Sequence, residues 1–235
     1  TWGVLDATEQ VATENSQVVE GLWGLATGGL KGQGLSRGEC TFIPAYKTDM
    51  ILESIGTQLG FWGILLVMLL YCMLLRRSVV VGYKSYHPFS FYLCTGISIV
   101  TGIQILIIAL GSLGIIPLTG VAVPFLSYGK VSMILNLFAF GLILSVSHYG
   151  CNSNLDHSMV NKYNGPTALI TGVFTLLILF VCGTFFKYQV LDRKDTLMRH
   201  LFVKTSSQEP EIRYNPRIQL LTKKMRMGDI YDRNG

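Results

Sequence analysis

The 235-residue chain is half hydrophobic and only 14% charged, with a mean hydropathy of +0.43. Soluble domains carry about 25% charged residues, so this balance predicts a membrane protein. The net charge of +5 comes largely from the C-terminal tail, which argues against a uniform nucleic-acid-binding surface. The five cysteines are widely spaced and form no C-x-x-C pair, so neither a disulfide framework nor a zinc site is indicated.

A glycine-rich segment precedes the apolar part of the chain, with five glycines in the eleven residues from Gly28 to Gly38. Such a backbone is flexible, and its N–H groups can approach an anion closely. Lys31, Arg37 and Lys47 supply cationic side chains nearby. The segment matches neither common phosphate-loop motif. Anion binding and a plain flexible loop therefore both stay open.

Asp49 stands at the start of the first apolar run, and Glu53 follows it by four residues. An acid at the beginning of a helix is favoured by the helix dipole, which is a purely structural explanation. Residues four apart share one helix face. Two acids that meet at a half-buried membrane boundary also suit a general base or a metal ligand. On the residues alone, both explanations of Asp49 stay open.

Four apolar stretches approach the roughly 20 residues that a spanning helix needs. They run over about residues 50–75, 89–113, 131–146 and 167–186. We therefore predict an all-α fold, a multi-spanning helical membrane protein.

The predicted topology follows from the positive-inside rule. Three basic residues lie between the first and second stretches, so this short connection is expected in the cytoplasm. Residues 1–49, residues 115–129 and the tail from 188 onward are then expected outside, and residues 148–166 inside.

Residues 115–129 are apolar, yet two prolines and two glycines keep them from forming a regular helix. Irregular backbone at membrane depth is tolerated only where it is buried in protein or lines a wet cavity. We therefore expect a re-entrant-like loop that borders a site, with a plain connector as the alternative. Within the spans, Gln104 and Asn136 are polar. Both fit either a functional position or interhelical hydrogen bonding.

Several short motifs, taken in chain order, together resemble the SEDS family (shape, elongation, division and sporulation), to which RodA and FtsW belong. The motifs are Gly28-Gly29-Leu30-Lys31-Gly32-Gln33-Gly34, Pro44, Lys47-Thr48-Asp49, Leu59-Gly60, Gln104, Pro117-Leu118-Thr119-Gly120-Val121 and Pro124-Phe125-Leu126-Ser127-Tyr128-Gly129. The resemblance covers roughly residues 17–147. It implies that residues 1–49 are the last large extracellular loop of that family, that residues 50–147 are its last three transmembrane helices, and that further helices precede them.

The resemblance implies a peptidoglycan glycosyltransferase that polymerises lipid II. The growing glycan is transferred from its undecaprenyl diphosphate carrier to a hydroxyl of an incoming unit, which needs a base for the proton and cations for the leaving diphosphate. The essential aspartate of the family matches Asp49, and Glu53 is a second candidate catalytic acid. Candidate substrate-binding residues are Lys31, Arg37, Lys47, Thr48, Gln104, Ser127, Tyr128 and Asn136. A divalent cation, Mg²⁺ or Mn²⁺, is a candidate cofactor, with Asp49 as a candidate ligand.

The tail carries a second resemblance, to the start of a class B penicillin-binding protein. The similar residues are Tyr214-Asn215-Pro216-Arg217 and Gly228-Asp229-Ile230-Tyr231-Asp232-Arg233-Asn234-Gly235. It implies a membrane anchor at 167–187, the beginning of an extracellular pedestal domain at 188–235, and a cytoplasmic linker at 148–166. The implied partners are lipid II, the carrier-linked glycan, the fused penicillin-binding protein and the bacterial cytoplasmic membrane, with no nucleic acid.

Three positions depart from the pattern of the resembled family. Gln58 stands in place of a glutamate, Ile108 in place of an asparagine, and Lys130 in place of a glycine. Each change removes a polar or flexible element near the expected cavity. A lipid-linked precursor transporter and a non-catalytic scaffold for the penicillin-binding part therefore remain as alternatives. We expect the fragment by itself to be inactive, because the site needs the preceding helices.

Overall fold

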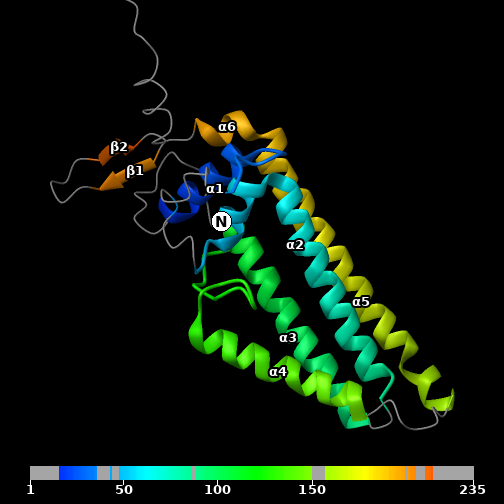
Figure 1. The fold of residues 1–235 in the computed structure, drawn as a ribbon. Coiled ribbons are helices and arrows are strands. Elements are labelled where there is room, and N and C mark those ends of the chain that lie inside the picture. Colours follow the sequence, from blue (N-terminus) through cyan, green and yellow to red (C-terminus); the bar gives the residue numbers. More distant parts are fainter. Residues whose placement is uncertain are drawn as a thin grey trace, which may run out of the picture.

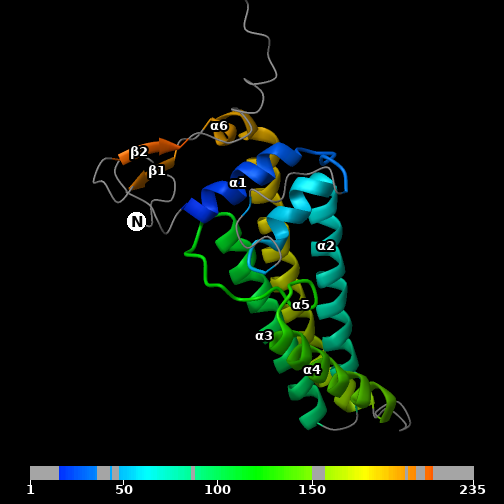
Figure 2. The same ribbon diagram turned by 60° about the vertical axis from the view of Figure 1, so that its left-hand side comes forward.

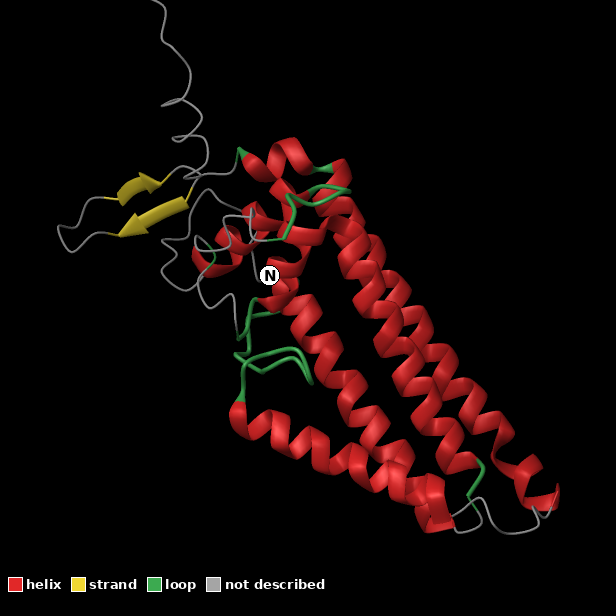
Figure 3. Cartoon of the chain, in the orientation of Figure 1, coloured by secondary structure: helices red, strands yellow, loops and turns green. Residues whose placement is uncertain are grey.

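The structure of the protein is a computed structural model that describes residues 16–35, 43, 48–85, 88–149, 157–198, 201–204 and 210–213. Its helices are α1 (Ser16–Gly28), α2 (Ile51–Tyr83), α3 (Pro88–Ser112), α4 (Lys130–Tyr149), α5 (His157–Phe186) and α6 (Arg193–Leu197), and a π-helical turn, η3 (Lys187–Leu191), joins α5 to α6. Strands β1 (Leu201–Lys204) and β2 (Pro210–Arg213) form a short antiparallel hairpin. Figures 1 and 3 show this order.

Four helices in the described part are long and apolar enough to cross a membrane. They are Ile51–Tyr83, Pro88–Ser112, Lys130–His148 and Thr167–Leu191. The predicted multi-spanning helical fold is confirmed. The two four-residue strands lie beyond these spans, where the sequence predicts the beginning of another domain.

The helices α2, α3 and α5 run alongside one another in both ribbon views (Figures 1 and 2). Their shared core includes Met68, Ile105, Val181 and Phe185, which are buried. Gly102 lets α3 and α5 approach closely, because a Cβ at this position would lie 2.2 Å from the Phe174 ring. Small residues at helix contacts are typical of membrane bundles. The remaining long helix, α4, diverges from α3 in Figure 1 and exposes most of its side chains.

One end of the bundle gathers the segments that matter for the site. Helix α1, the loop between α3 and α4, η3 and α6 all lie at this end (Figures 1 and 2). The beginning of α2 and the end of α3 meet there as well. The candidate residue Asp49 directly precedes this part of α2.

Two helices are longer than predicted. The hydropathy pattern predicts that the first span stops at Leu75, before a pair of arginines, but α2 continues to Tyr83. Arginine is a good helix former, and its exposed side chain lets the charge reach water. The end of an apolar run therefore does not mark the end of the helix. Likewise α5 begins at His157, ahead of the predicted start of the fourth span. Helix α1 is not among the predicted elements, because residues 1–49 are interpreted from the sequence only as a loop.

Candidate functional site

The loop from residue 113 to residue 129 is irregular, as its prolines and glycines predict. Two of its carbonyl groups are satisfied by side chains from neighbouring spans. Gln104 of α3 donates from Nε2 to the carbonyl of Ala122 at 2.9 Å, and the Tyr71 hydroxyl of α2 donates to the carbonyl of Pro124. Non-helical backbone at membrane depth requires such partners. Gln104 therefore serves to hold the loop.

Ser127 joins this loop to the beginning of α2. Its hydroxyl donates to the carbonyl of Thr48 at 2.6 Å and accepts the backbone N–H of Val123 at 2.8 Å. The side chain is nearly fully buried. Two predicted site residues, Thr48 and Ser127, are therefore brought together, and Asp49 is the next residue in the chain.

The Asp49 carboxylate faces the first half of the same loop. A Cβ added to Gly120 would lie 3.8 Å from Asp49 Oδ2. Gly120 has φ +63°, a left-handed conformation that favours glycine. Asp49 is partly exposed. The first half of the loop thus lies near the Asp49 carboxylate, and the second half contacts the preceding residue, Thr48.

A groove of about 540 Å³ opens beside this junction. It lies between the first residue of α2, the second half of the loop and the first turns of α4. Its lining residues are Ile51, Phe125, Leu126, Ser127, Tyr128, Gly129, Lys130, Met133 and Ile134. The size is typical of a ligand pocket, and mostly apolar walls with few polar groups are usual in such sites. Tyr128 is 70% exposed, and Lys130 brings a cation to the groove.

Glu53 lies away from the groove, in full burial. It packs against α1, where a Cβ on Gly21 would lie 3.2 Å from Glu53 Cγ. Its polar neighbours are the Ser112 hydroxyl and the Asp49 carboxylate. Neither of its carboxylate oxygens has a hydrogen-bond partner among the described residues. Glu53 is therefore close to Asp49 but is not placed to touch a ligand in the groove.

The glycine segment uses three of its N–H groups within the protein. Gly32 N–H donates to the carbonyl of Gly28 at 2.9 Å, Gln33 N–H to Thr57 at 3.0 Å, and Gly34 N–H to Gln58 at 2.9 Å. Two of these three donors are bound to α2. These three N–H groups are therefore used within the protein, where the glycines bring two backbones together, and anion binding by the segment stays a prediction.

Lys31 does not converge on Asp49. The loop that carries it contacts α2 around Gly60, eleven residues beyond Asp49, which is about 16 Å along a helix. Its side chain is exposed. The role of Lys31 in holding a diphosphate stays a prediction, and the structure does not support it directly.

The remaining predicted site residues divide into two groups. Asn136 donates from Nδ2 to the Ser132 carbonyl at 2.9 Å and to its hydroxyl at 3.3 Å, so its amide is engaged within α4. Arg37 and Lys47 lie outside the described residues. In the described part of the chain, no three His, Cys, Asp or Glu side chains gather as a metal site would require.

The family model for FtsW/RodA/SpoVE cell cycle proteins matches residues 3–152, which include α1 to α4. The chain belongs to this family. With its four apolar helices, it is a multi-pass protein of the inner membrane.

Named relatives agree with this assignment. The chain is 33% identical over 145 residues to a probable peptidoglycan glycosyltransferase FtsW of Geobacter sp. (strain M18), covering 61% of this chain and 40% of the relative. A second such FtsW, from Geobacter metallireducens, is 35% identical over 145 residues, covering 61% of this chain and 39% of the relative. A peptidoglycan glycosyltransferase RodA of Mycobacterium bovis is 33% identical over 132 residues, covering 56% of this chain and 28% of the relative. The chain thus spans 40% or less of the length of these relatives. No solved structure matches it.

The positions that depart from the family pattern have distinct surroundings. The Gln58 amide lies 3.4 Å from the Ser54 hydroxyl, to which it donates. Ile108 is buried in the bundle core. Lys130 begins α4 and lines the groove. Lys130 therefore gives the groove a charged group at a position where the family pattern has a glycine.

Sequence reasoning missed three residues that shape this end of the molecule. Tyr71 lies within an apolar span, and its polar tip is the signal that a buried tyrosine needs a partner. Gln189 and Arg193 lie beyond the matched region, in η3 and at the start of α6. Their contacts with α1 and α2 link regions more than 130 residues apart, which no local pattern indicates.

Proposed function

We propose that the intact protein is a peptidoglycan glycosyltransferase that polymerises lipid II at a site built on Asp49. The observation that carries this proposal is the place of the Asp49 carboxylate, which is partly exposed, faces Gly120 and adjoins the Ser127–Thr48 hydrogen bond beside the groove. The names of the relatives support the reaction class.

The proposed chemistry is a displacement at the anomeric carbon of the growing glycan. Asp49 accepts the proton of the acceptor hydroxyl while that oxygen forms the new glycosidic bond. The bond from the anomeric carbon to the diphosphate oxygen breaks, and the carrier diphosphate leaves with the electron pair. Cations stabilise the charge that develops on this leaving group. Lys130 is placed in the groove to contribute, while Lys31, Arg37 and Lys47 remain candidates.

A divalent cation fits this site only in part. Mg²⁺ is commonly held by one or two carboxylates together with substrate phosphates. Asp49 offers one accessible carboxylate, and the substrate diphosphate would have to complete the ligands. When bound, Mg²⁺ or Mn²⁺ would neutralise the diphosphate.

Glu53, the second candidate acid, takes a supporting role in this proposal. It is fully buried, whereas Asp49 is partly exposed, so it acts through Asp49 as a positioning residue. Its contact with Gly21 ties the first turn of α2 to α1.

We also propose that α5 is the membrane anchor of a fused class B penicillin-binding protein. Helix α5 begins after the matched region 3–152, and the tail motifs resemble the start of such a protein. In this arrangement the end carrying α1 and α6 faces the outside of the cell. The residues that carry the tail motifs lie outside the described part of the chain.

The test is lipid II polymerisation by the full-length protein in lipid vesicles. Replacing Asp49 by Asn or Ala removes the base and should reduce polymer formation by about 100-fold or more. Asp195→Asn, an exposed acid on α6, is the matched control and should polymerise normally. Polymer of unaltered amount and length from Asp49→Ala would contradict the proposal.

The same experiment separates the alternatives. Precursor movement across the vesicle membrane that survives loss of Asp49 would favour a transporter, because moving a lipid needs a path but no base. A wild-type protein that forms no polymer yet retains penicillin binding would favour a scaffold.

A further inference from the structure

Helix α2 is broken at Gly60, and the break is closed by other parts of the chain. Gly60 has φ 71° and ψ −164°, far from helical values. In a regular helix the carbonyls of residues 57 and 58 accept the N–H groups four residues later. Here the Thr57 and Gln58 carbonyls accept N–H groups of the glycine segment, and Phe61 N–H donates to the Gly29 carbonyl at 2.9 Å.

The carbonyl of Gly56, one residue before these two, also accepts a donor from a distant part of the chain. Gln189 of η3 donates from Nε2 to this carbonyl at 2.9 Å. Gln189 is fully buried, although glutamine side chains are mostly exposed to solvent in folded proteins. A buried amide donor needs a partner, and the Gly56 carbonyl supplies one for Gln189 Nε2.

Arg193, at the start of α6, makes a second contact of the same kind. Its Nε donates to the carbonyl of Ala26 at 2.8 Å, and its Nη2 donates to that of Thr27 at 3.3 Å. These are carbonyls at the C-terminal end of α1, where a helix has no donors of its own and where the dipole favours a cation. A Cβ on Gly29 would lie 3.3 Å from Arg193 Nη1, so the guanidinium also lies against the glycine segment.

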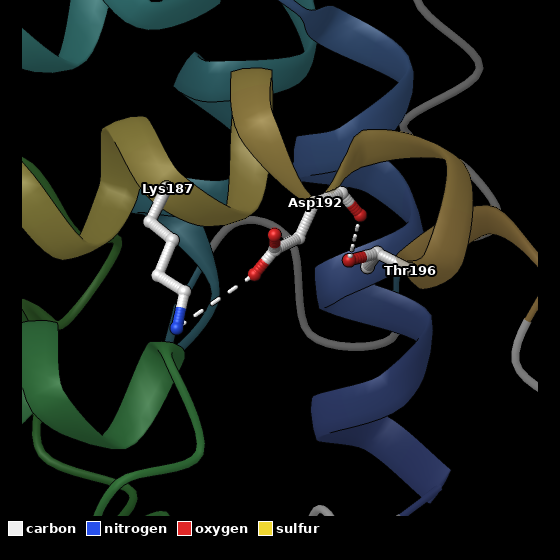
Figure 4. Close-up of polar contacts among 3 residues, drawn as sticks. All are labelled: Lys187, Asp192 and Thr196. Carbon is white, nitrogen blue, oxygen red and sulfur yellow. Dashed lines mark hydrogen bonds and ion pairs between the residues drawn. The ribbon is translucent and has the colours of Figure 1, made fainter.

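The π-helical turn places these two side chains. Asp192 N–H donates to the Lys187 carbonyl at 2.9 Å, and Thr196 donates from its hydroxyl to the Asp192 carbonyl at 2.8 Å. Lys187 Nζ lies 3.8 Å from Asp192 Oδ2, an ion pair across the same turn. Figure 4 shows how these residues connect the end of α5 to α6. The turn therefore directs Gln189 toward α2 and Arg193 toward α1.

The contacts continue from these two residues to Asp49. Helix α1 packs on the first turn of α2, where a Cβ on Gly21 would lie 3.3 Å from the Met50 sulfur. Met50 is fully buried and follows Asp49 directly. Fixing the C-terminal end of α1 and the break in α2 therefore fixes the segment that presents Asp49.

We propose that Gln189 and Arg193 form a clamp that positions the candidate active site. In this proposal η3 and the start of α6 contribute to the activity of the polymerase. The clamp is defined by the Gln189–Gly56 hydrogen bond and the Arg193 hydrogen bonds to Ala26 and Thr27. Both residues are positioning residues, because they touch backbone and not the reacting groups. The effect on turnover rests on the proposed function; the effect on the backbone at the break does not.

The clamp is tested on the intact protein with two readouts. Gln189→Met keeps the volume and removes the donor, and Arg193→Met does the same at an exposed position where the fold is not at risk. Lys194→Met, an adjacent exposed cation, is the matched control for the second variant. Hydrogen exchange at Gln33, Gly34 and Phe61 reports the break itself, and lipid II polymerisation kinetics report the site.

We expect both clamp variants to speed exchange at these amides by about tenfold. We also expect kcat to fall by about tenfold or more while KM stays within about twofold, since misplacing a catalytic group affects turnover. Arg193→Lys should restore part of the rate.

Exchange that stays at the wild-type rate would overturn the clamp, and faster exchange with unchanged kcat would overturn its positioning role. A wild-type protein without polymerase activity would contradict the proposed function, while exchange would still test the clamp. Should Gln189→Met fail to fold, Arg193→Met decides the outcome.

Discussion

Two irregular segments in the described part of the chain lie against its membrane helices, and they are held in different ways. The loop over residues 113–129 is held by side chains: Gln104, Tyr71 and Ser127 each bind one or more of its backbone groups or join it to α2. The glycine segment is held mostly by direct contact of its backbone with the backbone of α2. A Cβ on Gly32 would lie 2.2 Å from the Gln58 carbonyl oxygen.

The difference predicts how each segment responds to change. Side-chain ties can be removed one at a time, so the loop should lose stability in steps. Backbone contact at Gly32 leaves no room for a side chain there, so the glycine segment should be disrupted by one methyl group added at a contact position. The loop adjoins the Asp49 site and the glycine segment adjoins the break in α2, so the two failures should also differ in their effect on function.

The largest effect is expected for Gly60→Ala. A Cβ there would lie 2.4 Å from Gly32 N and 2.5 Å from the Leu30 carbonyl oxygen, and φ is +71°. Strain and backbone clash together should destabilise the protein by about 3 kcal/mol or more, measured by unfolding of the purified protein in detergent.

Two further glycines separate the effect of backbone strain from that of steric clash. Gly34 has φ +96° but open space around its Cβ position, so Gly34→Ala should cost about 1 kcal/mol, from strain alone. Gly141 is helical with nothing within 4 Å, and Gly141→Ala should be neutral or slightly stabilising. Equal losses at Gly60 and Gly34 would show that backbone contact does not hold the segment.

An intermediate effect is expected for Ser127→Ala in the loop. The change leaves the Thr48 carbonyl and the Val123 N–H without their partner, which should cost about 2 kcal/mol. Because Thr48 adjoins Asp49, polymerisation should also slow by about tenfold or more. Ser145→Ala on the exposed side of α4 is the control. A loss of stability with full turnover would limit Ser127 to a structural role.

The smallest effect is expected for Asn136→Leu. Its amide binds only within α4 in the described structure, so stability should change by less than about 0.5 kcal/mol. Polymerisation should stay within about twofold of wild type. A large loss of turnover with unchanged stability would instead support the substrate-binding role that the sequence predicts.

Hydropathy predicted the spans because a spanning helix depends on one local property of the sequence, an uncharged apolar stretch long enough to cross the membrane. The irregular loop was predicted for the same reason, since Pro117 and Pro124 act on their own neighbourhood. The junction of Asp49 with the loop was not visible in composition, and only the ordered motifs of the family indicated it. The Ser127–Thr48 contact joins residues 79 apart in sequence.

The glycines show why part of the site could not be predicted. Closely spaced glycines beside basic residues are compatible with anion binding and with close backbone packing, and composition cannot separate these. The spacing of Gly28 and Gly32, repeated at Gly56 and Gly60, is the small-xxx-small pattern of helix contacts. That repeat was the available signal for packing. Gln189 and Arg193 had no such signal, because their partners Gly56, Ala26 and Thr27 lie more than 130 residues earlier in the chain.

The π-helical turn η3 has a consequence for how this chain tolerates length changes. A π-turn is one residue more than an α-turn, and in an α-helix each residue rotates the next part of the chain by about 100°. Deleting Val190 would therefore turn Arg193 away from α1 while leaving Gln189 near its place. Between Gln189 and Arg193 the number of residues, more than their chemical identity, keeps the two clamp residues directed at their partners.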